Sequence, residues 1–274
     1  MPLPSEFTFS QSNLQDYLAC PRRFELRYIE GQRWPAVETE PVRDREIHMR
    51  QGADFHHMVH QHVIGVPERT LTARARIDPI RRWWQAYLKN GLAGLPAQRH
   101  AEITLSAPLA GYRLLAKYDL IAIEPGERLI IMDWKTSLNV PSPTQTAIKM
   151  QTRIYPYVLV EAGFHLNGEA PVAPEQIKMV YWFAEAPDDP QTFDYNTASH
   201  TRNRDDLTAL IEEIAARDRF DLTADSSRCR FCAYRSLCNR GVEAGDERDI
   251  DFEDADPVND PLDFDLDQIA EIEF

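Results

Sequence analysis

The sequence has no long apolar run, no mark of export and no nucleotide-binding loop. No stretch of its 274 residues approaches the about 18 consecutive apolar residues of a membrane-spanning helix, so no membrane partner is expected. The opening residues, MPLPSEFTFS, lack the basic start and apolar run of a secretory signal. The pattern G-x-x-x-x-G-K-[ST] is absent, which excludes a P-loop helicase motor within this sequence. We therefore expect a cytoplasmic protein.

Positive charge is also scarce: the sequence has 30 Lys and Arg against 44 Asp and Glu, which gives a net charge of −14. Residues 246–274 account for most of this, with thirteen acidic residues and one basic residue, Arg248. The rest has 31 acidic and 29 basic residues, and such a body can still present a basic groove. We expect the acidic tail to be mostly disordered. Its end, LDFDLDQIAEIEF, predicts a peptide that docks on a partner or on the protein's own groove, with a solubilising tail as the alternative.

Cysteine is rare, and its spacing is informative. Cys20 lies 209 positions before a C-x2-C-x5-C triplet formed by Cys229, Cys232 and Cys238. Disulfides are uncommon in cytoplasmic proteins, so the layout favours metal ligation. A centre shared by all four thiols would join the two ends of the chain and stabilise it by closing a long loop. Structural zinc usually recruits two knuckle pairs, which this arrangement of one plus three does not match.

Apolar periodicity predicts helices first, then three strands, one helix, one strand and a last helix. The segment from Phe9 to Ile29 predicts a helix with Ser10 or Ser12 as N-cap, interrupted or restarted at Pro21. The other expected elements are helices at 44–64, 72–90, 144–162 and 200–218, and strands at 101–109, 112–123, 128–134 and 176–184.

The run LIIMDWKTS ends a buried strand with two charges. Asp133 and Lys135 are two apart, so they point to the same side of the strand. Asp119 ends the apolar part of the preceding strand, and a hairpin would bring it close to Asp133. A divalent cation relieves the repulsion of two such carboxylates, and a nearby lysine suits metal-assisted hydrolysis of a phosphodiester. A D-x-K triplet alone arises by chance about once in a chain of this length.

Several motifs, in this order, resemble the PD-(D/E)XK nuclease superfamily. The resemblance is to its RecB-like branch with an iron–sulfur cluster, which includes AddB-type and CRISPR-associated exonucleases, and it covers roughly residues 9–240. Its motifs are FSQSNLQDYLACPRRFELRYI with Cys20, the G-x-x-x-H of Gly52 to His56, Asp119 in AKYDLI, the D-x-K of Asp133 to Lys135, the Q-x-x-x-Y of Gln151 to Tyr155, and the cysteine triplet.

The resemblance implies an α/β fold with a restriction-endonuclease-like core, in which helices flank a central mixed sheet. It implies a single nuclease domain over 1–245, with a helical region at 1–95, a catalytic core at 100–184, and a helix with the cysteine triplet at 200–240. The acidic tail, 246–274, follows. A metal cluster would join the helical N- and C-terminal segments.

The resemblance also assigns the site residues. Mg²⁺ or Mn²⁺ would be bound by His56, Asp119, Asp133 and a backbone carbonyl such as that of Trp134, with His57 and His60 as substitutes for His56. Lys135 would orient the attacking water, and Gln151 and Tyr155 would reach the site or the substrate backbone. A [4Fe–4S] cluster would be held by Cys20, Cys229, Cys232 and Cys238, with zinc or free thiols as alternatives. The arginines beside these cysteines would offset its charge or contact phosphates; they are Arg22, Arg23, Arg228, Arg230 and Arg235.

The implied activity is a metal-dependent DNA nuclease, and in particular an exonuclease on single-stranded or free ends. Repair, recombination and CRISPR adaptation all use this branch, so a helicase, recombination or CRISPR protein is an expected partner. The alternative is a non-catalytic nucleic-acid-binding or scaffold subunit that keeps the fold. Two departures bear on substrate positioning: Ala116 stands where a glycine often precedes the strand acid, and Pro156 directly follows the motif tyrosine.

Overall fold

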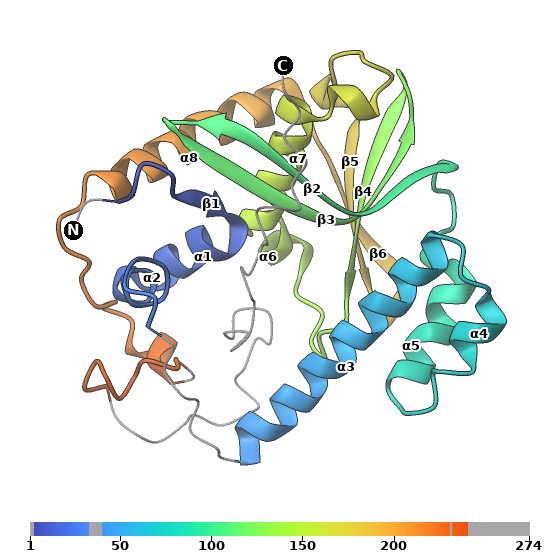
Figure 1. Cartoon of the computed structure of the whole chain (residues 1–274), viewed down its shortest axis with the longest axis horizontal. Helices are drawn as coiled ribbons and strands as arrows, with labels where there is room; N and C mark the ends of the chain where they lie inside the picture. Colours follow the sequence, from blue (N-terminus) through green and yellow to red (C-terminus); the bar gives the residue numbers. More distant parts are fainter. Residues whose placement is uncertain (1–2, 33–39, 231, 241–274) are drawn as a thin grey trace.

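The computed structural model describes residues 3–32, 40–230 and 232–240, and for 40–46 it describes the backbone alone. The acidic tail at 246–274 lies outside these residues. Within them, six strands form one mixed sheet with helices on both faces (Figure 1). In the described part of the chain, no helix is both long and apolar enough to cross a membrane.

Four of the six strands lie where the sequence predicts them, and two were missed. The missed strands are β1, which has three residues, and β6, whose sequence APDDPQTFD has no apolar alternation. Both are therefore defined by pairing with a neighbour rather than by their own pattern. The strands are β1 (Thr8–Ser10), β2 (Gln98–Leu109), β3 (Tyr112–Glu124), β4 (Arg128–Lys135), β5 (Ile177–Phe183) and β6 (Ala186–Asp194).

Strand β3 organises the sheet. One edge of β3 pairs with β2 along its length, so β1 and β4 must share the other edge. The parallel pairing with β1 ends at Leu115, and the antiparallel pairing with β4 begins at Leu120. Among the described residues, 116–119 of β3 thus have no strand partner on that edge, and we call this segment the sheet gap. Beyond β4, the parallel strand β5 and the antiparallel strand β6 complete the sheet.

The helices agree with prediction in type but differ at their ends. Ser10 is the N-cap of α1, and Pro21 starts α2, both as expected. The helix predicted at 72–90 begins only at Ile80, because Pro79 disfavours helical backbone at the residue before it. The eight α-helices of the described part are α1 (Gln11–Ala19), α2 (Pro21–Phe24), α3 (Glu40–Val63), α4 (Glu68–Thr72), α5 (Ile80–Ala86), α6 (Pro143–Ala147), α7 (Met150–Ala162) and α8 (Thr197–Ala215).

The helix predicted at 144–162 is in fact two helices, α6 and α7. Lys149 between them has an extended backbone, and the Thr152 hydroxyl donates a hydrogen bond to the Thr146 carbonyl oxygen at 2.6 Å. The same carbonyl also accepts the backbone N–H of Lys149 at 3.2 Å, so the end of α6 is satisfied without a continuous helix. Pro156 lies inside α7, which continues past it to Ala162.

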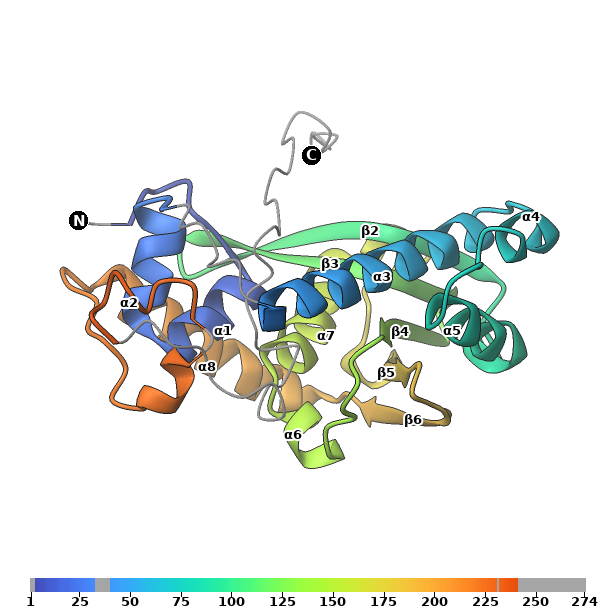
Figure 2. The same cartoon turned by 90° about the horizontal axis from the view of Figure 1, so that it is seen from below.

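Two hydrophobic cores lie on opposite faces of the sheet. The first packs α1, α7 and α8 on one face, and includes Tyr17, Ile154 and Ile211. The second packs α3 and α5 on the other face, and includes Phe55 and Trp83. Figures 1 and 2 place α1 and α2 at one end of the molecule and α4 and α5 at the other, with the long α3 between them. Because β1 leads directly into α1, the start of α1 lies beside the sheet gap. Residues of α3 line the same cavity as the gap.

Candidate active site

The residues predicted to act in catalysis line one cavity of about 790 Å³ beside the sheet gap. Its walls come from the start of α1, from α3, from the gap segment of β3, from the end of β4 and from α7. The structure thus brings together every predicted metal-binding and catalytic residue: His56, Asp119, Asp133, Trp134, Lys135, Gln151 and Tyr155.

Asp119 is held between α3 and β4. Its Oδ2 lies 3.4 Å from Nδ1 of His56 and accepts a hydrogen bond of 3.0 Å from the backbone N–H of Trp134. Trp134 therefore reaches the site through its backbone, while its indole packs in the second core. The predicted role of its carbonyl oxygen stays a prediction.

Asp133 is enclosed by Lys135 and Gln151. The Lys135 ammonium lies 2.9 Å from Oδ2 of Asp133 and donates a hydrogen bond of 3.0 Å to Oε1 of Gln151. The Gln151 amide in turn donates to Oδ1 of Asp133 at 2.5 Å. Asp133 is 3% exposed, so these contacts form a closed triangle that fixes the direction of the lysine.

The pKa values of the two carboxyl groups, Asp119 and Asp133, are shifted in opposite directions. Burial alone would raise the pKa of Asp119, but His56, Lys135 and the Trp134 amide outweigh it and lower that pKa. Burial, with repulsion from Asp119, raises the pKa of Asp133 from 3.8 to about 6 despite the attraction of Lys135. Burial opposes the charged imidazole of His56, yet Asp119 raises its pKa. Asp119 is thus kept ionised, whereas Asp133 binds a proton more readily than an exposed aspartate does.

The described residues include no group of three His, Cys, Asp or Glu side chains placed to hold a metal ion. The donor types nevertheless fit a hard divalent cation, since one imidazole and two carboxyl groups face one cavity. The ion would replace the proton that His56 shares with Asp119, and it would compete with Lys135 for Asp133.

Gln151 and Tyr155 share one face of α7, as their spacing predicts. The backbone carbonyl of Tyr155 accepts a hydrogen bond from the Tyr118 hydroxyl at 2.8 Å, and the two rings pack 4.9 Å apart. Burial and the nearby Asp133 raise the pKa of Tyr155, so it remains a neutral phenol. The proline at 156 leaves both motif side chains on the cavity wall.

Three further histidines line the cavity, and a fourth does not. His57 and His60 line its wall beside His56. His62 instead lies 3.0 Å from the Tyr87 hydroxyl on the α5 side. His48, which sequence reasoning did not single out, also lines the cavity, and its Nε2 donates a hydrogen bond of 2.8 Å to the Thr136 carbonyl oxygen. This bond anchors α3 to the residue directly after Lys135.

The close approach of α3 to β4 explains the glycine of the G-x-x-x-H motif. A Cβ added at Gly52 would lie 2.7 Å from Oγ1 of Thr136, closer than side-chain contacts allow. Glycine therefore lets α3 approach the end of β4 and places His56, one turn later, opposite Asp119.

A change in pleat at the sheet gap points Asp119 into the cavity. Tyr118 packs in the first core and Leu120 in the second, although residues two apart normally share a face. The change occurs opposite Glu102 of β2, where the β2–β3 ladder skips one pair and Glu102 has a φ of 52°. Glu102 and Lys117 both line the cavity, and neither was predicted from the sequence. No sequence signal marks this irregularity.

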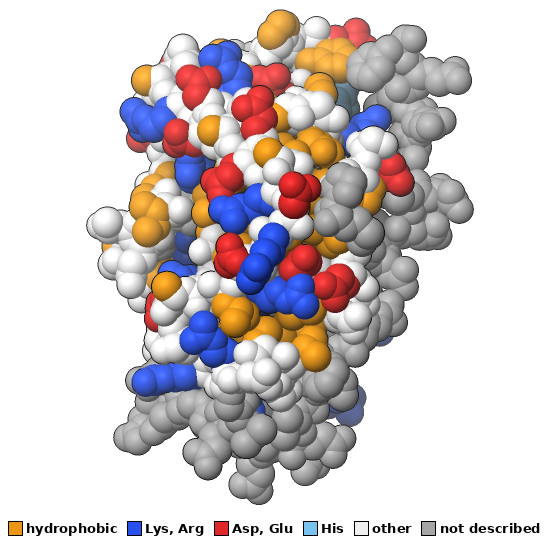
Figure 3. Space-filling view, turned by 90° about the vertical axis from the view of Figure 1, so that its left-hand side faces the viewer, with side chains coloured by type: hydrophobic (Ala, Val, Ile, Leu, Met, Phe, Trp, Pro, Cys, Tyr) orange, Lys and Arg blue, Asp and Glu red, His pale blue; other side chains and the backbone are white. Residues whose placement is uncertain are grey.

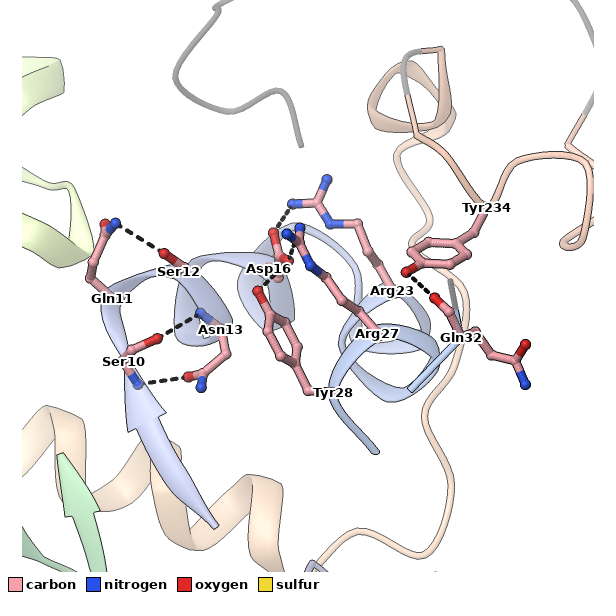
Figure 4. Close-up of polar contacts among 10 residues, drawn as sticks. All are labelled: Ser10, Gln11, Ser12, Asn13, Asp16, Arg23, Arg27, Tyr28, Gln32 and Tyr234. Atoms are coloured by element: carbon pink, nitrogen blue, oxygen red, sulfur yellow. Dashed lines mark hydrogen bonds and ion pairs between the residues drawn. The ribbon is translucent and has the colours of Figure 1, made fainter. Parts of the chain in front are cut away.

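The start of α1 forms part of the cavity wall through Ser10, Gln11 and Ser12, whose side chains are drawn in Figure 4. Ser10 and Asn13 cap the helix reciprocally, which leaves the amides of Gln11 and Ser12 without an intrahelical acceptor. Further along α1, the buried carboxylate of Asp16 accepts contacts from the side chains that follow Cys20: Arg23 at 2.5 Å, Arg27 at 3.3 Å and Tyr28 at 3.0 Å.

The four cysteines, far apart in sequence, line a second cavity of about 20 Å³. The Tyr234 hydroxyl, within the triplet segment, donates to the Gln32 carbonyl oxygen at 2.8 Å and ties it to the N-terminal region (Figure 4). Burial raises the pKa of the Cys229 and Cys238 thiols. Among the described residues, these thiols are not placed at metal-binding geometry. Their number and type still fit a thiolate-ligated centre.

Several arginines near the cysteines are paired with acids, which the sequence did not indicate. Arg22 pairs with Glu25 and Glu30, and Arg228 pairs with Asp225. Figure 3 shows basic and acidic side chains interspersed on this side of the molecule rather than a uniform basic patch. The acids paired with Arg22 and Arg228 therefore compete with any phosphate for these two side chains.

Comparisons with known proteins agree with this architecture. Among curated proteins, none matches the chain. Among solved structures, a protein named "Putative exonuclease" from Eubacterium rectale is similar at 10% identity and a TM-score of 0.50, over 88% of this chain and 90% of that one. The protein SSO0001 is similar at 15% identity and a TM-score of 0.43, over 88% and 89%. The likeness to the Eubacterium rectale protein concerns the fold alone. The family model of the PD-(D/E)XK nuclease superfamily matches residues 8–239, and the chain therefore belongs to that superfamily.

Proposed function

We propose that this protein is a divalent-metal-dependent DNA nuclease that hydrolyses phosphodiester bonds, acting as an exonuclease on single-stranded ends. The observation that carries the proposal is the convergence of His56, Asp119, Asp133, Lys135 and Gln151 on one cavity. These residues come from α3, β3, β4 and α7, so no single element explains their meeting. Membership of the PD-(D/E)XK nuclease superfamily supports the proposed nuclease activity, although a fold alone does not establish an activity.

In this proposal His56, Asp119 and Asp133 hold Mg²⁺ or Mn²⁺, together with a backbone carbonyl such as that of Trp134. When bound, the metal would activate water and stabilise the leaving oxygen. Lys135 orients the nucleophile or steadies charge on the phosphate, and Gln151 keeps its ammonium directed into the cavity. Tyr155, a neutral phenol, contributes a hydrogen-bond donor to the substrate backbone.

We further propose that Cys20, Cys229, Cys232 and Cys238 hold a [4Fe–4S] cluster, with zinc as the alternative. The proposal rests on their shared cavity and on the chemistry of four thiols. A brown sample with broad absorbance near about 400 nm that is lost in Cys20→Ser would support the cluster. A colourless protein with one equivalent of zinc would support zinc instead.

The test of catalysis is a Lys135→Ala variant, assayed on end-labelled single-stranded DNA with Mn²⁺. We expect cleavage to fall by about two to four orders of magnitude, the range typical of a positioned catalytic group. Lys178→Ala is the matched control, because Lys178 pairs with Asp194 at 3.1 Å on β5, away from the cavity. A Lys135→Ala protein that degrades DNA at the wild-type rate would end this mechanism.

The second candidate is a non-catalytic nucleic-acid-binding or scaffold subunit of a helicase–nuclease complex. It is favoured by the contacts of Asp133, whose Oδ1 accepts a hydrogen bond from Gln151 and whose Oδ2 lies 2.9 Å from the Lys135 ammonium, so a metal would have to compete with that lysine. Tight DNA binding with no product at any Mg²⁺ or Mn²⁺ concentration would favour this candidate. Repair or recombination and CRISPR adaptation are the pathways we propose for either role, with a helicase, recombination or CRISPR protein as partner.

A further inference from the structure

Lys117 and Glu102 form an ion pair on the wall of the catalytic cavity. Nζ of Lys117 lies 2.8 Å from Oε2 of Glu102, and both residues line the cavity. The Lys117 side chain is 52% exposed, whereas that of Glu102 is 25% exposed. A pair this open to solvent contributes little to folding stability. An anion that enters the cavity can therefore compete with Glu102 for the Lys117 ammonium.

The backbone at this pair has an unusual conformation. Glu102 has a φ of 52°, a conformation that glutamate seldom adopts, and it sits where the β2–β3 ladder skips a pair. Its side chain reaches the cavity and contacts Lys117 instead of joining either core. Strained backbone conformations of this kind persist only where the surrounding structure holds them, and they are common at functional sites.

The position of Lys117 suits a phosphate next to the one that is cleaved. Lys117 precedes Asp119 by two residues on the sheet gap, and both point into the cavity. Two residues of strand span about 6.4–6.8 Å, a distance on the scale of one nucleotide step in an extended strand. Within the part of the chain that the structure describes, no strand pairs with this edge of β3, so an extended chain can approach it.

We propose that Lys117 binds a non-bridging oxygen of a phosphate adjacent to the scissile one in a single-stranded DNA substrate. In the free protein Glu102 holds the ammonium in place and competes with that phosphate. Lys117 is thus a substrate-binding residue, and Glu102 sets how strongly it binds. This inference rests on the proposed nuclease function, and it adds a contact one nucleotide away from the metal site.

The test measures the dissociation constant of a labelled single-stranded oligonucleotide in Ca²⁺ over a series of NaCl concentrations, with DNA integrity checked on a gel. For Lys117→Ala we expect about 5- to 20-fold weaker binding, and a slope of log affinity against log salt that is smaller by about 0.7. Lys117→Arg should retain the wild-type slope. The Glu102→Gln protein should bind the oligonucleotide about 2- to 5-fold more tightly than wild type. In a protein that already carries Lys117→Ala, the same substitution should have a smaller effect.

Lys89→Ala is the matched control, because Lys89 is a 68% exposed lysine that pairs with Asp188 at 2.9 Å outside the cavity. A Lys117→Ala protein with the wild-type slope and affinity would overturn the inference. So would a lower melting temperature without a change of slope, since that result marks a structural role. If the wild type neither binds nor cleaves any DNA, the proposed function itself is wrong. Cleavage by the wild type with no effect at Lys117 rejects only this inference.

Discussion

The Asp133→Asn substitution should stabilise the metal-free protein while it abolishes catalysis. Asp133 is 3% exposed, and burial with the nearby Asp119 raises its pKa from 3.8 to about 6. Each pKa unit corresponds to about 1.4 kcal/mol, so at neutral pH the ionised carboxylate costs the folded state about 3 kcal/mol. This figure already includes the attraction of Lys135. Asparagine removes the charge and can still accept the hydrogen bond from Gln151.

The effect should depend on pH in a defined direction. A carboxyl group whose pKa is raised by folding favours the folded state when it is protonated, and this contribution is lost as pH rises through the folded pKa. The difference in unfolding free energy between Asp133→Asn and wild type should therefore be near zero below about pH 4. It should grow between about pH 4 and 6 and level off near 3 kcal/mol above about pH 7.

The assay is urea or thermal unfolding in EDTA across pH 4 to 8, where each kcal/mol shifts the melting temperature by about 2–4 °C. Asp194→Asn is the control, because the Asp194 side chain is 80% exposed and its loss should change stability by less than about 0.5 kcal/mol. Added Mn²⁺ should raise the melting temperature of wild type and not of Asp133→Asn. An Asp133→Asn protein that is less stable than wild type at pH 8 in EDTA would refute the reasoning.

Two further predictions concern the packing around the site. Gly52→Ala should destabilise the protein by about 1 kcal/mol although alanine favours helices, because the new Cβ would lie 2.7 Å from Oγ1 of Thr136. Thr136→Ala in the same protein should restore stability, and equal melting temperatures of the single and double variants would contradict the clash. Asp16→Ala should cost about 3–5 kcal/mol, since it leaves the 8% exposed Arg23 without its carboxylate. Asp78→Ala, whose side chain is 61% exposed beside Arg81, should lie within about 0.5 kcal/mol of wild type in the same urea titration.

The sequence predicted the strands and helices whose own pattern is strong. The apolar runs that became β3, β4 and β5 are long and buried, so their period is visible without a neighbour. Strand β6 is polar and β1 is three residues long, so both were missed. The break between α6 and α7 coincides with an extended backbone at Lys149 and with the bond from Thr152 to Thr146, neither of which a pattern of apolar residues encodes.

Local spacing determined which side chains of this protein could act together within one element. Two residues along β4 place Asp133 beside Lys135, and one turn of α7 aligns Gln151 with Tyr155. Only the tertiary structure decided what lies across from them. The gap in the sheet, the strained turn of the backbone at Glu102 and the approach of α3 at Gly52 arise from contacts between distant segments, and long-range contacts leave no period in the sequence.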